Sequence, residues 1–373
     1  MDQRRITQTC FPSRYIQGPG ALGMIPGIVK GFGTRALLIV DGFVKDKVLP
    51  EVSHHLQGAD LVTEAFGGEC TEAEIERLTA IGKDRKCDSV IGFGGGKTLD
   101  TTKAVSSYLK APIVIAPTLA STDAPCSARA VIYTQSGEVV RYLDLPKNPD
   151  VVLLDTSLIV KAPVRFLISG IGDALSTWFE AESCMIKGSA NSTCGAGHLH
   201  PGSMTAYGLA KLCYETLCEY GELAVVSARA GACTPAFEKI VEANTLLSGL
   251  GFESGGLGCA HAVHNGLSEL SECHKFMHGE KVAIGVLTGL FFTDQPKDLI
   301  DKVYTLCERV GLPTCLEDVG IKNATDEKLW IIANRTCVPE ETIHNELKPG
   351  VPDAVFQALK AADKEGRRRK GKA

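Results

Sequence analysis

The chain changes its character at Pro163, and this change constrains its fold more than any other feature of the sequence. Before that residue, short apolar runs typical of buried strands alternate with helical stretches; the runs cover residues 36–41, 88–93, 113–116 and 151–155. Parallel strands need such long crossover connections. The alternation therefore predicts a parallel sheet with helices on both of its faces.

Two segments of the first half have identifiable local structure. Residues 71–80 show an amphipathic pattern that starts at Thr71, which predicts a helix with a threonine N-cap. Residues 131–142 instead contain two strand-like runs around Gln135-Ser-Gly137. They predict a hairpin inserted in the α/β region.

After Pro163 the strand signals disappear and helical patterns follow one another. The predicted helices include residues 179–182, 203–219, 236–250, 282–292, 299–310 and 353–364. Residues 188–202, which include His198 and His200, are rich in Gly, Ser and His and predict a surface loop. We therefore predict an α/β domain over residues 1–162, an all-α domain over 163–365 and a solvated basic tail over 366–373.

Composition excludes several classes of protein. The chain has 373 residues and a formal net charge of −5, which argues against a nucleic-acid-binding surface. No apolar run approaches the roughly 20 residues that span a bilayer, and no secretory signal is visible after Met1. The 14 cysteines are scattered without a CxxC pair, which is typical of reduced thiols. We expect a cytoplasmic protein with neither a membrane nor a nucleic-acid partner.

The segment Gly92-Phe-Gly-Gly-Gly-Lys97 lies between a predicted strand and a predicted helix over residues 98–109. Glycines at such a turn let the backbone approach an anion, and the first N–H groups of the helix are donors with positive potential. The segment is neither a Walker A loop, because residue 91 is Ile, nor GxGxxG, because residue 97 is Lys. A tight turn is the plain alternative, but the order of strand, glycines, lysine and helix favours a pyrophosphate site.

Asp41 ends the predicted strand over residues 36–41. An acidic residue at the carboxyl end of a strand, beside a nucleotide site, binds ribose hydroxyls and repels a 2′-phosphate. On this interpretation Asp41 predicts a preference for NAD over NADP. The alternative is an aspartate that only stabilises a turn.

Four of the nine histidines, at positions 261, 264, 274 and 278, fall close together in the sequence. The residues before them are small and apolar, and a buried imidazole costs free energy unless both of its nitrogens are satisfied. A divalent metal ion would satisfy them, and hydrogen-bonded or surface histidines are the alternative. Cys259 and Cys273 lie nearby, either as further ligands or as small buried hydrophobic residues.

Four stretches of sequence, taken in order, identify a family. They are residues 92–100 (GFGGGKTLD), 116–123 (APTLASTD), 170–181 (GIGDALSTWFEA) and His261-Ala-Val-His-Asn-Gly with His278-Gly-Glu-Lys. Over nearly its whole length the chain resembles the metal-dependent glycerol dehydrogenases, in the superfamily of iron-activated alcohol dehydrogenases and dehydroquinate synthase. This resemblance implies a dehydroquinate synthase-like fold, with a Rossmann-like NAD-binding domain followed by an all-α domain that binds metal and substrate.

The resemblance also implies the metal site. The ligands of one ion per subunit would be Asp173, His261 and His278. Iron-activated alcohol dehydrogenases have a further histidine where this chain has Thr177, one helical turn after Asp173. One carboxylate and two imidazoles suit Zn²⁺ with an open position for substrate, so we expect zinc rather than iron. His264 and His274 are then expected to be non-ligands.

The same resemblance implies contacts to NAD and to the substrate. Besides Asp41, the expected cofactor contacts are Gly95, Gly96, Lys97, Asp100, Thr118, Ser121, Ser127, Arg129 and Tyr133. Residues 95–100 would form the pyrophosphate turn, and the hairpin residues would lie beside the nicotinamide. Arg129 departs from the smaller apolar residue expected at its position. Asp123 lies where a polyol hydroxyl would bind.

Together these parts predict a metal-assisted oxidation of an alcohol. Glycerol, or a related vicinal diol such as 1,2-propanediol, would chelate Zn²⁺, which lowers the pKa of a bound hydroxyl. Hydride would then pass from C2 to NAD and leave dihydroxyacetone, with Asp123, Asp173, His261 and His278 as the catalytic set and no obligatory protein base. The resemblance further implies a homo-oligomer.

Three alternatives use the same fold. One is a dehydrogenase of a phosphorylated polyol of the glycerol-1-phosphate type. Another is a dehydroquinate synthase-like lyase, whose phosphate-ester substrate needs several basic residues, whereas the metal segment is poor in Arg. The third is a non-enzymatic nucleotide-sensing scaffold, against which the intact set of Asp173, His261 and His278 argues.

Overall fold

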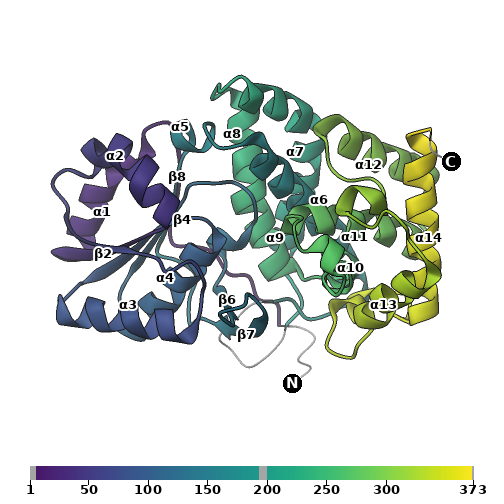
Figure 1. The fold of residues 1–373 in the computed structure, drawn as a ribbon, viewed down its shortest axis with the longest axis horizontal. Helices are drawn as coiled ribbons and strands as arrows, with labels where there is room; N and C mark the ends of the chain where they lie inside the picture. The colour runs from purple at the N-terminus through teal and green to yellow at the C-terminus, as the bar shows by residue number, and fades with distance from the viewer. Residues whose placement is uncertain (1–5, 193–199, 372–373) are drawn as a thin grey trace.

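The first half of the chain is built on one parallel sheet, shown at the left of Figure 1. The structure, a computed structural model, describes residues 6–192 and 200–371. The six strands lie in the order β1-β8-β5-β4-β2-β3, and every pairing is parallel, as predicted. They are β1 (Tyr15–Gly18), β2 (Arg35–Val40), β3 (Asp60–Ala65), β4 (Ser89–Gly94), β5 (Ile113–Pro117) and β8 (Val151–Asp155).

Helices cover both faces of this sheet, which explains the continuous apolar runs of its central strands. Successive residues of a strand point to opposite faces. Leu38 and Val40 of β2 therefore pack toward α1, whereas Leu37 and Ile39 pack toward α3 and α4. The helices are α1 (Ile25–Phe32), α2 (Leu49–Val52), α3 (Glu72–Asp84), α4 (Gly96–Leu109) and α5 (Thr156–Ile159). Thr71 caps α3 as predicted, because its side chain accepts the N–H of Glu74.

The sequence analysis missed β1 and β3, which form the two edges of the sheet. The residues of both strands are at most partly buried, and β3 contains Asp60 and Glu64. An edge strand that is exposed along one side needs no continuous apolar run. Its sequence therefore lacks the signal by which the central strands were recognised.

The predicted hairpin is present as β6 (Arg129–Tyr133) and β7 (Val139–Asp144), which pair antiparallel as a separate sheet. Ala130 and Ile132 are fully buried, and Ile132 packs in the same apolar cluster as residues of α4. The outer strand β7 is largely exposed. The hairpin thus covers one side of the helix that follows the glycine turn.

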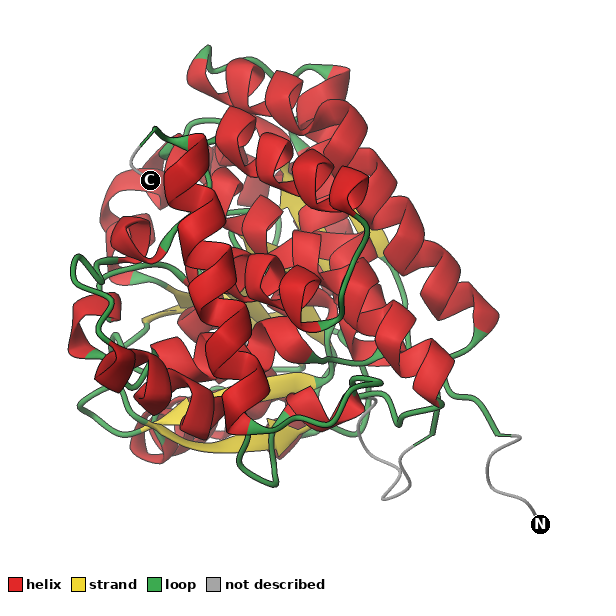
Figure 2. Ribbon diagram, turned by 90° about the vertical axis from the view of Figure 1, so that its right-hand side faces the viewer, coloured by secondary structure: helices red, strands yellow, loops and turns green. Residues whose placement is uncertain are grey.

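The second half is helical, and Figure 2 shows its helices in front of the strands. Its helices are α6 (Val164–Lys187), α7 (Met204–Arg229), α8 (Pro235–Glu242), α9 (Ser248–Gly255), α10 (Cys259–Leu267), α11 (His278–Phe292), α12 (Lys297–Val310), α13 (Asp326–Thr336) and α14 (Pro352–Arg369). No strand follows β8 in the described ranges, so the predicted all-α region is confirmed. The exact division at residues 162 and 163 stays a prediction.

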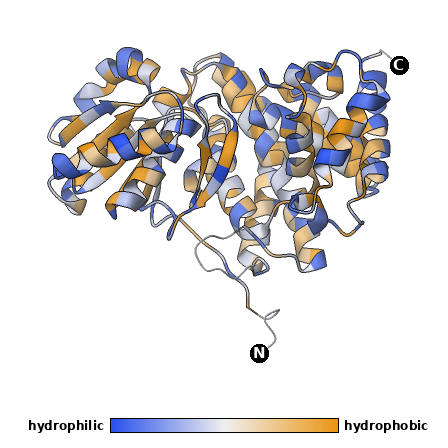
Figure 3. Cartoon of the chain, turned by 60° about the horizontal axis from the view of Figure 1, so that its bottom comes forward, coloured by the Kyte–Doolittle hydropathy of each residue, from blue (hydrophilic) through white to orange (hydrophobic). Residues whose placement is uncertain are grey.

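Burial explains how these helices pack and why two of them escaped prediction. The main core joins α6, α7, α8 and α11 to the face of the sheet that carries Ile115 and Val152. Figure 3 shows apolar residues gathered inside both halves of the molecule. The helices α10 and α13 were not predicted. Six of the nine residues of α10 are Cys, Ala, His or Gly, which give little apolar contrast between its faces. The helix packs against α11, α13 and α6.

Part of the basic run predicted as a solvated tail belongs to a helix. Helix α14 continues to Arg369. Nη1 of Arg369 lies 3.0 Å from Asp301 and its Nε 2.7 Å from Glu308, both on α12. Arg369 therefore packs against α12 through ion pairs with two acidic residues. Sequence composition alone could not reveal these partners. Lys372 lies outside the described residues.

Other expectations have simple outcomes. Every described cysteine is a free thiol. No helix in the described part of the chain is long and apolar enough to cross a membrane. Within the predicted loop over residues 188–202, the carbonyl oxygen of His200 accepts the N–H of Asn191 at 2.8 Å, and His198 lies outside the described residues.

Candidate metal and cofactor site

Donor side chains from three different helices converge at one point. Asp173 lies on α6, His261 on α10, and His278 is the first residue of α11. Nε2 of His278 lies 3.1 Å from Oδ1 of Asp173, and Nε2 of His261 lies 3.6 Å from the same oxygen. The three ligand atoms all lie within 4.8 Å of one another. The structure therefore brings together the three residues that the resemblance implied as metal ligands.

Two glycines allow α6 and α11 to approach closely enough for this cluster to form. A Cβ on Gly279 would lie 1.8 Å from the carbonyl oxygen of Ser169, and one on Gly172 would lie 2.3 Å from the carbonyl oxygen of Gly279. Both distances are far below van der Waals contact, so any side chain would push the helices apart. The glycines thus hold His278, the neighbour of Gly279, against Asp173.

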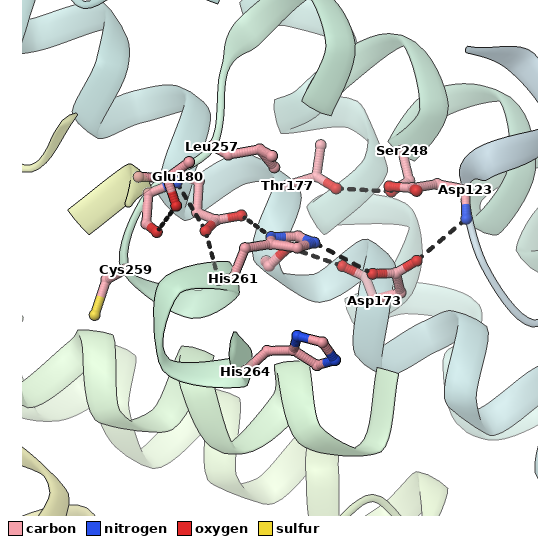
Figure 4. Close-up of polar contacts among 12 residues, drawn as sticks. Asp123, Asp173, Thr177, Glu180, Ser248, Leu257, Cys259, His261 and His264 are labelled. Atoms are coloured by element: carbon pink, nitrogen blue, oxygen red, sulfur yellow. Dashed lines mark hydrogen bonds and ion pairs between the residues drawn. The ribbon is translucent and has the colours of Figure 1, made fainter. Parts of the chain in front are cut away.

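Glu180, to which the sequence analysis assigned no role, orients His261 (Figure 4). Its Oε2 lies 2.7 Å from Nδ1 of His261, and its Oε1 accepts the backbone N–H groups of Gly258 and His261. An imidazole whose Nδ1 proton is held by a carboxylate presents a lone pair at Nε2. The sequence contained a signal, since Glu180 follows Asp173 by two helical turns and so lies on the same face of α6.

The cluster carries buried negative charge. Oδ1 of Asp173 is buried and accepts no hydrogen bond. Burial alone would raise the pKa of Asp173, but His278 and His261 outweigh burial and hold that pKa below its ordinary value. Burial also opposes ionisation of Glu180, and His261 with two backbone N–H groups lowers its pKa. Two buried carboxylates, two imidazoles and an oxygen without a donor are a set that fits a divalent cation.

The remaining histidines and cysteines of this segment lie outside the donor cluster. Nε2 of His264 lies 3.0 Å from Nδ1 of His278, on the side of that ring away from Asp173. Nε2 of His274 lies 3.0 Å from a backbone carbonyl oxygen. Cys259 and Cys273 are buried in an apolar cluster, so the interpretation of these cysteines as candidate ligands is wrong. They are small hydrophobic residues.

Asp123 faces the cluster from the loop after β5. Its N–H donates to Oδ2 of Asp173 at 3.2 Å, and its own Oδ2 accepts a hydrogen bond from Oγ of Ser248 at 2.7 Å. Its side chain makes no capping hydrogen bond to the turn over residues 124–126. The carboxyl group is therefore placed by the helical half of the chain rather than by its own turn.

The charge of Asp123 is coupled to the cluster. Burial raises the pKa of Asp123 well above its ordinary value, the negative charge of Asp173 raises it further, and the hydrogen bond from Ser248 lowers it. A divalent cation held by Asp173 would favour the carboxylate instead, since nearby positive charge stabilises the ionised form.

Thr177 lies on α6 one helical turn after Asp173, at the position for which the resemblance implied a histidine in other families. Its hydroxyl is buried and lies 2.8 Å from the hydroxyl of Ser248. Ser248 directly follows a π-helical turn over residues 243–247. The turn places Ser248 between Thr177 and Asp123, so position 177 contributes to holding Asp123 and offers no imidazole.

The predicted pyrophosphate turn lies where the strand order reverses. The chain passes from β2 to β3 on one side and from β4 to β5 on the other. In open α/β sheets, ligands bind at the carboxyl ends of strands at such a point. Gly95 caps α4, and a Cβ on Gly96 would meet no atom within 4 Å. The space before the first N–H groups of α4 is therefore open to an anion.

Asp41 lies beside this turn, and a Cβ on Gly94 would lie 3.0 Å from its Cβ. Oδ1 of Asp41 accepts the N–H groups of Phe43 and Val44, at 2.9 and 3.3 Å. Its Oδ2 makes no hydrogen bond to a described residue. The turn-stabilising alternative is therefore confirmed for one oxygen, and the ribose contact stays a prediction for the other.

The predicted cofactor residues Lys97 and Tyr133 are neighbours. Nζ of Lys97 lies 2.5 Å from Oε2 of Glu69 and 5.0 Å from the centre of the Tyr133 ring. Glu69 precedes α3, so three separate segments meet at this side of the glycine turn. The ion pair with Glu69 holds Lys97 near the open space before the first residues of α4.

Three other predicted cofactor residues have their side chains engaged within the protein. Asp100 is buried and accepts the N–H of Val131 at 3.1 Å, which ties α4 to the hairpin. Burial raises the pKa of Asp100 to about 6, against the effect of Lys103. The Ser127 hydroxyl lies 3.3 Å from Nζ of Lys103, and Nε of Arg129 lies 2.9 Å from Asp144.

The loop after β5 links the glycine turn to the donor cluster. At its start the N–H of Thr118 donates to the carbonyl oxygen of Gly94 at 3.0 Å. The carbonyl oxygen of Ser121 accepts a hydrogen bond from Ser169 of α6 at 3.3 Å. The loop ends at Asp123. A molecule that lies on the glycine turn and extends along this loop would reach the donor cluster.

Comparisons with known proteins agree with this arrangement. Residues 12–156 match the family described as iron-containing alcohol dehydrogenase. A glycerol dehydrogenase from Thermotoga maritima is 57% identical over 98% of this chain and 99% of its own length. The crystal structure of glycerol dehydrogenase from Schizosaccharomyces pombe has a TM-score of 0.90 at 38% identity, over 99% of this chain and 94% of that one. A probable glycerol dehydrogenase from Sinorhizobium meliloti has a TM-score of 0.89 at 40% identity, over 97% and 99%.

Proposed function

We propose that this chain, which belongs to the glycerol dehydrogenases within the iron-containing alcohol dehydrogenase family, oxidises glycerol to dihydroxyacetone. NAD would be the hydride acceptor. One observation carries the proposal. The cluster of Asp173, His261 and His278 lies at the end of a loop whose first residue, Thr118, bonds to the open glycine turn. Related vicinal diols such as 1,2-propanediol are expected as further substrates.

The donor cluster would hold the metal ion. Asp173, His261 and His278 supply one oxygen and two nitrogens, and Glu180 keeps Nε2 of His261 available by holding its Nδ1 proton. The side chain of His278 is 37% exposed, whereas that of Asp173 is 1% exposed. The open side of the cluster is therefore the side of His278. A bound divalent cation supplies Lewis-acid polarisation of a substrate hydroxyl there, which lowers the pKa of that hydroxyl.

Asp123 would bind the second hydroxyl of the diol. Ser248 holds one of its oxygens at 2.7 Å, and the other is available to accept from a substrate hydroxyl. Together with the donor cluster, Asp123 fixes the orientation of the carbon that loses hydride, which is where positioning lowers the barrier. No protein base is obligatory, because water or a ribose hydroxyl of a bound cofactor would accept the hydroxyl proton.

We propose zinc as the metal. The choice rests on the donor set of one carboxylate and two imidazoles, with Thr177 bonded to Ser248 at the position of a fourth ligand. Three protein ligands and an open position are typical of catalytic Zn²⁺. Metal analysis of the purified protein, with activity measured after chelation and after readdition of Zn²⁺, Fe²⁺ or Mn²⁺, tests this choice.

The same site disfavours a phosphorylated substrate. Asp123 and Asp173 are buried carboxyl groups at the donor cluster, and Glu180 is a third behind His261. A phosphate ester would have to approach them without an arginine in the donor cluster. This charge argument favours a neutral diol over a substrate of the glycerol-1-phosphate type or of a dehydroquinate synthase-like lyase.

The deciding experiment compares substrates at saturating Zn²⁺. NAD reduction is followed with glycerol, 1,2-propanediol and glycerol-1-phosphate, for the wild-type protein, for Asp173→Asn and for His274→Gln as a matched control outside the cluster. We expect turnover of both diols, loss of at least about 100-fold in Asp173→Asn and near wild-type activity in His274→Gln. A preference for glycerol-1-phosphate would defeat the proposal. A homo-oligomer and a cytoplasmic location stay predictions, and sedimentation of the purified protein tests the first.

A further inference from the structure

The ring of His278 has a second partner on the side away from Asp173. Its Nε2 lies 3.1 Å from Asp173, whereas its Nδ1 lies 3.0 Å from Nε2 of His264. An imidazole can bind a cation through Nε2 only if its proton is on Nδ1, and that proton then needs an acceptor. His264 can be this acceptor only if its own proton is on Nδ1.

A chain of hydrogen bonds leads on from His264 to the periphery of the helical half. Nδ1 of His264 lies 3.0 Å from Oδ1 of Asn265. Nδ2 of Asn265 donates to both carboxylate oxygens of Glu341, at 3.0 and 3.1 Å. Glu341 forms an ion pair with Arg335, whose Nε lies 3.3 Å from Glu269. Both oxygens of Glu341 therefore act as acceptors, from Asn265 and from Arg335.

The direction of every hydrogen bond in this chain follows from its outer end. Both oxygens of Glu341 accept, so the group of Asn265 that faces them is its NH₂ donor. The carbonyl oxygen of Asn265 then faces Nδ1 of His264 and requires a proton there. Nε2 of His264 is left with a lone pair, which accepts the Nδ1 proton of His278. Nε2 of His278 consequently points its lone pair toward Asp173.

We propose that His264, Asn265 and Glu341 are positioning residues that set the tautomer of His278, so that an ion pair outside the donor cluster determines which nitrogen is offered to the metal. The inference rests on the metal site of the proposed function. The two imidazoles of that site differ in the group that holds their Nδ1 proton. For His261 it is the carboxylate of Glu180, and for His278 it is the neutral ring of His264, whose own tautomer is set by Asn265 and Glu341.

The hydrogen bonds on the two sides of His264 require a neutral ring, since Asn265 accepts at Nδ1 and His278 donates at Nε2. A doubly protonated His264 would have no lone pair at Nε2, and the hydrogen bond to His278 would be lost. The neutral ring also adds no second anionic partner to a site that already contains Asp173 and Glu180.

The first test measures metal binding rather than turnover. Zn²⁺ affinity is measured by competition with a chromophoric chelator, and the Co²⁺ absorption spectrum reports the geometry of the bound ion. We expect His264→Phe to weaken Zn²⁺ binding about 10–100-fold and to change the Co²⁺ spectrum, since the acceptor for His278 is gone. His264→Gln retains an acceptor oxygen and should bind Zn²⁺ within about 3-fold of wild type. The matched control His274→Gln should be unchanged.

The second test reads the tautomers directly. Solid-state ¹⁵N spectra of the histidine-labelled zinc protein should show His264 protonated at Nδ1 and unprotonated at Nε2. In Asn265→Leu this preference should disappear, with Zn²⁺ affinity reduced about 3–10-fold. Asn265→Leu also decides the matter if His264→Phe does not fold.

The outcomes are distinguishable. Wild-type protein that binds no stoichiometric Zn²⁺ would overturn the metal site of the proposed function. Wild-type protein that binds Zn²⁺ while His264→Phe and Asn265→Leu bind it equally well would overturn only the ordering role. The opposite tautomer at His264, with the proton on Nε2, would also overturn it.

Discussion

Replacement of Glu180 by Gln should reverse the tautomer of His261 and so remove a metal ligand without removing a hydrogen-bond network. Oε1 of Glu180 accepts the N–H groups of Gly258 and His261, and Oε2 faces Nδ1 of His261 at 2.7 Å. The carbonyl oxygen of glutamine satisfies the two backbone donors. Its NH₂ group then faces Nδ1, which must become an acceptor, and the imidazole proton moves to Nε2.

The magnitude follows from the bond that is lost. A hydrogen bond to a charged group contributes about 1.5–3 kcal/mol. At about 1.4 kcal/mol for each factor of ten, Glu180→Gln should weaken Zn²⁺ binding about 10–150-fold. Because the backbone N–H groups keep their acceptor, the thermal stability of the metal-free variant should change much less than its metal affinity.

The assay is chelator competition for Zn²⁺ at pH 6.5, with Glu346→Gln as the matched control. Glu346 is also a buried carboxyl group. Its Oε1 accepts the N–H of Cys259, the residue after Gly258, whose N–H is bound by Glu180. Burial raises the pKa of Glu346 to about 7, so at pH 6.5 it is already mostly neutral and glutamine changes little. Zn²⁺ affinity within about 3-fold of wild type for Glu180→Gln would refute the assignment of Glu180 as the residue that orients His261.

Four further predictions follow from the same contacts. Gly279→Ala should destabilise the fold by about 1–3 kcal/mol in urea unfolding, because its Cβ would lie 1.8 Å from the Ser169 carbonyl oxygen; an unchanged midpoint would show that α6 and α11 can separate freely. The pKa of Glu346 is raised from 4.5 to about 7, so the folded state binds the extra proton and stability falls as pH rises through that interval. Glu346→Gln should therefore gain on the order of 3 kcal/mol relative to wild type between pH 4.5 and pH 8, and parallel pH profiles of unfolding would contradict this. Asp41→Ser should raise kcat/KM for NADP about tenfold relative to NAD, and no change in the ratio would assign Asp41 to the turn alone. Asp123→Asn should lower kcat/KM for glycerol about 10–100-fold and raise it for lactate, whereas a fall on both substrates with a lower Tm would indicate a structural role.

The sequence was sufficient for the features that depend on continuous burial or on local geometry. The central strands β2, β4, β5 and β8 carry apolar residues on both faces, because helices cover both sides of the sheet. The cap at Thr71 and the hairpin depend on neighbouring residues, so each was visible in a short window. The donor residues Asp173, His261 and His278 were recognised through family motifs, and the structure brings them together.

Tertiary structure alone decided the features that depend on a partner distant in the chain. The edge strands β1 and β3 are defined by their neighbours in the sheet, and their own residues are too exposed to show a pattern. Arg369 contacts α12 through Asp301 and Glu308, which lie opposite it. The same holds for Ser248, which fixes Asp123 across more than a hundred residues of chain.

The difference is clearest at the metal site. A motif can name a ligand, because the residue type and its spacing are written in the sequence. Which nitrogen of that ligand carries the proton depends on the group on the far side of the ring, which is Glu180 for His261 and His264 for His278. His264 reaches His278 because α10 and α11 pack closely, where a Cβ on Gly285 would lie 2.2 Å from the carbonyl oxygen of Ala260. The sequence therefore determined which residues can bind the metal, and the packing of the helices decided the tautomers in which they can do so.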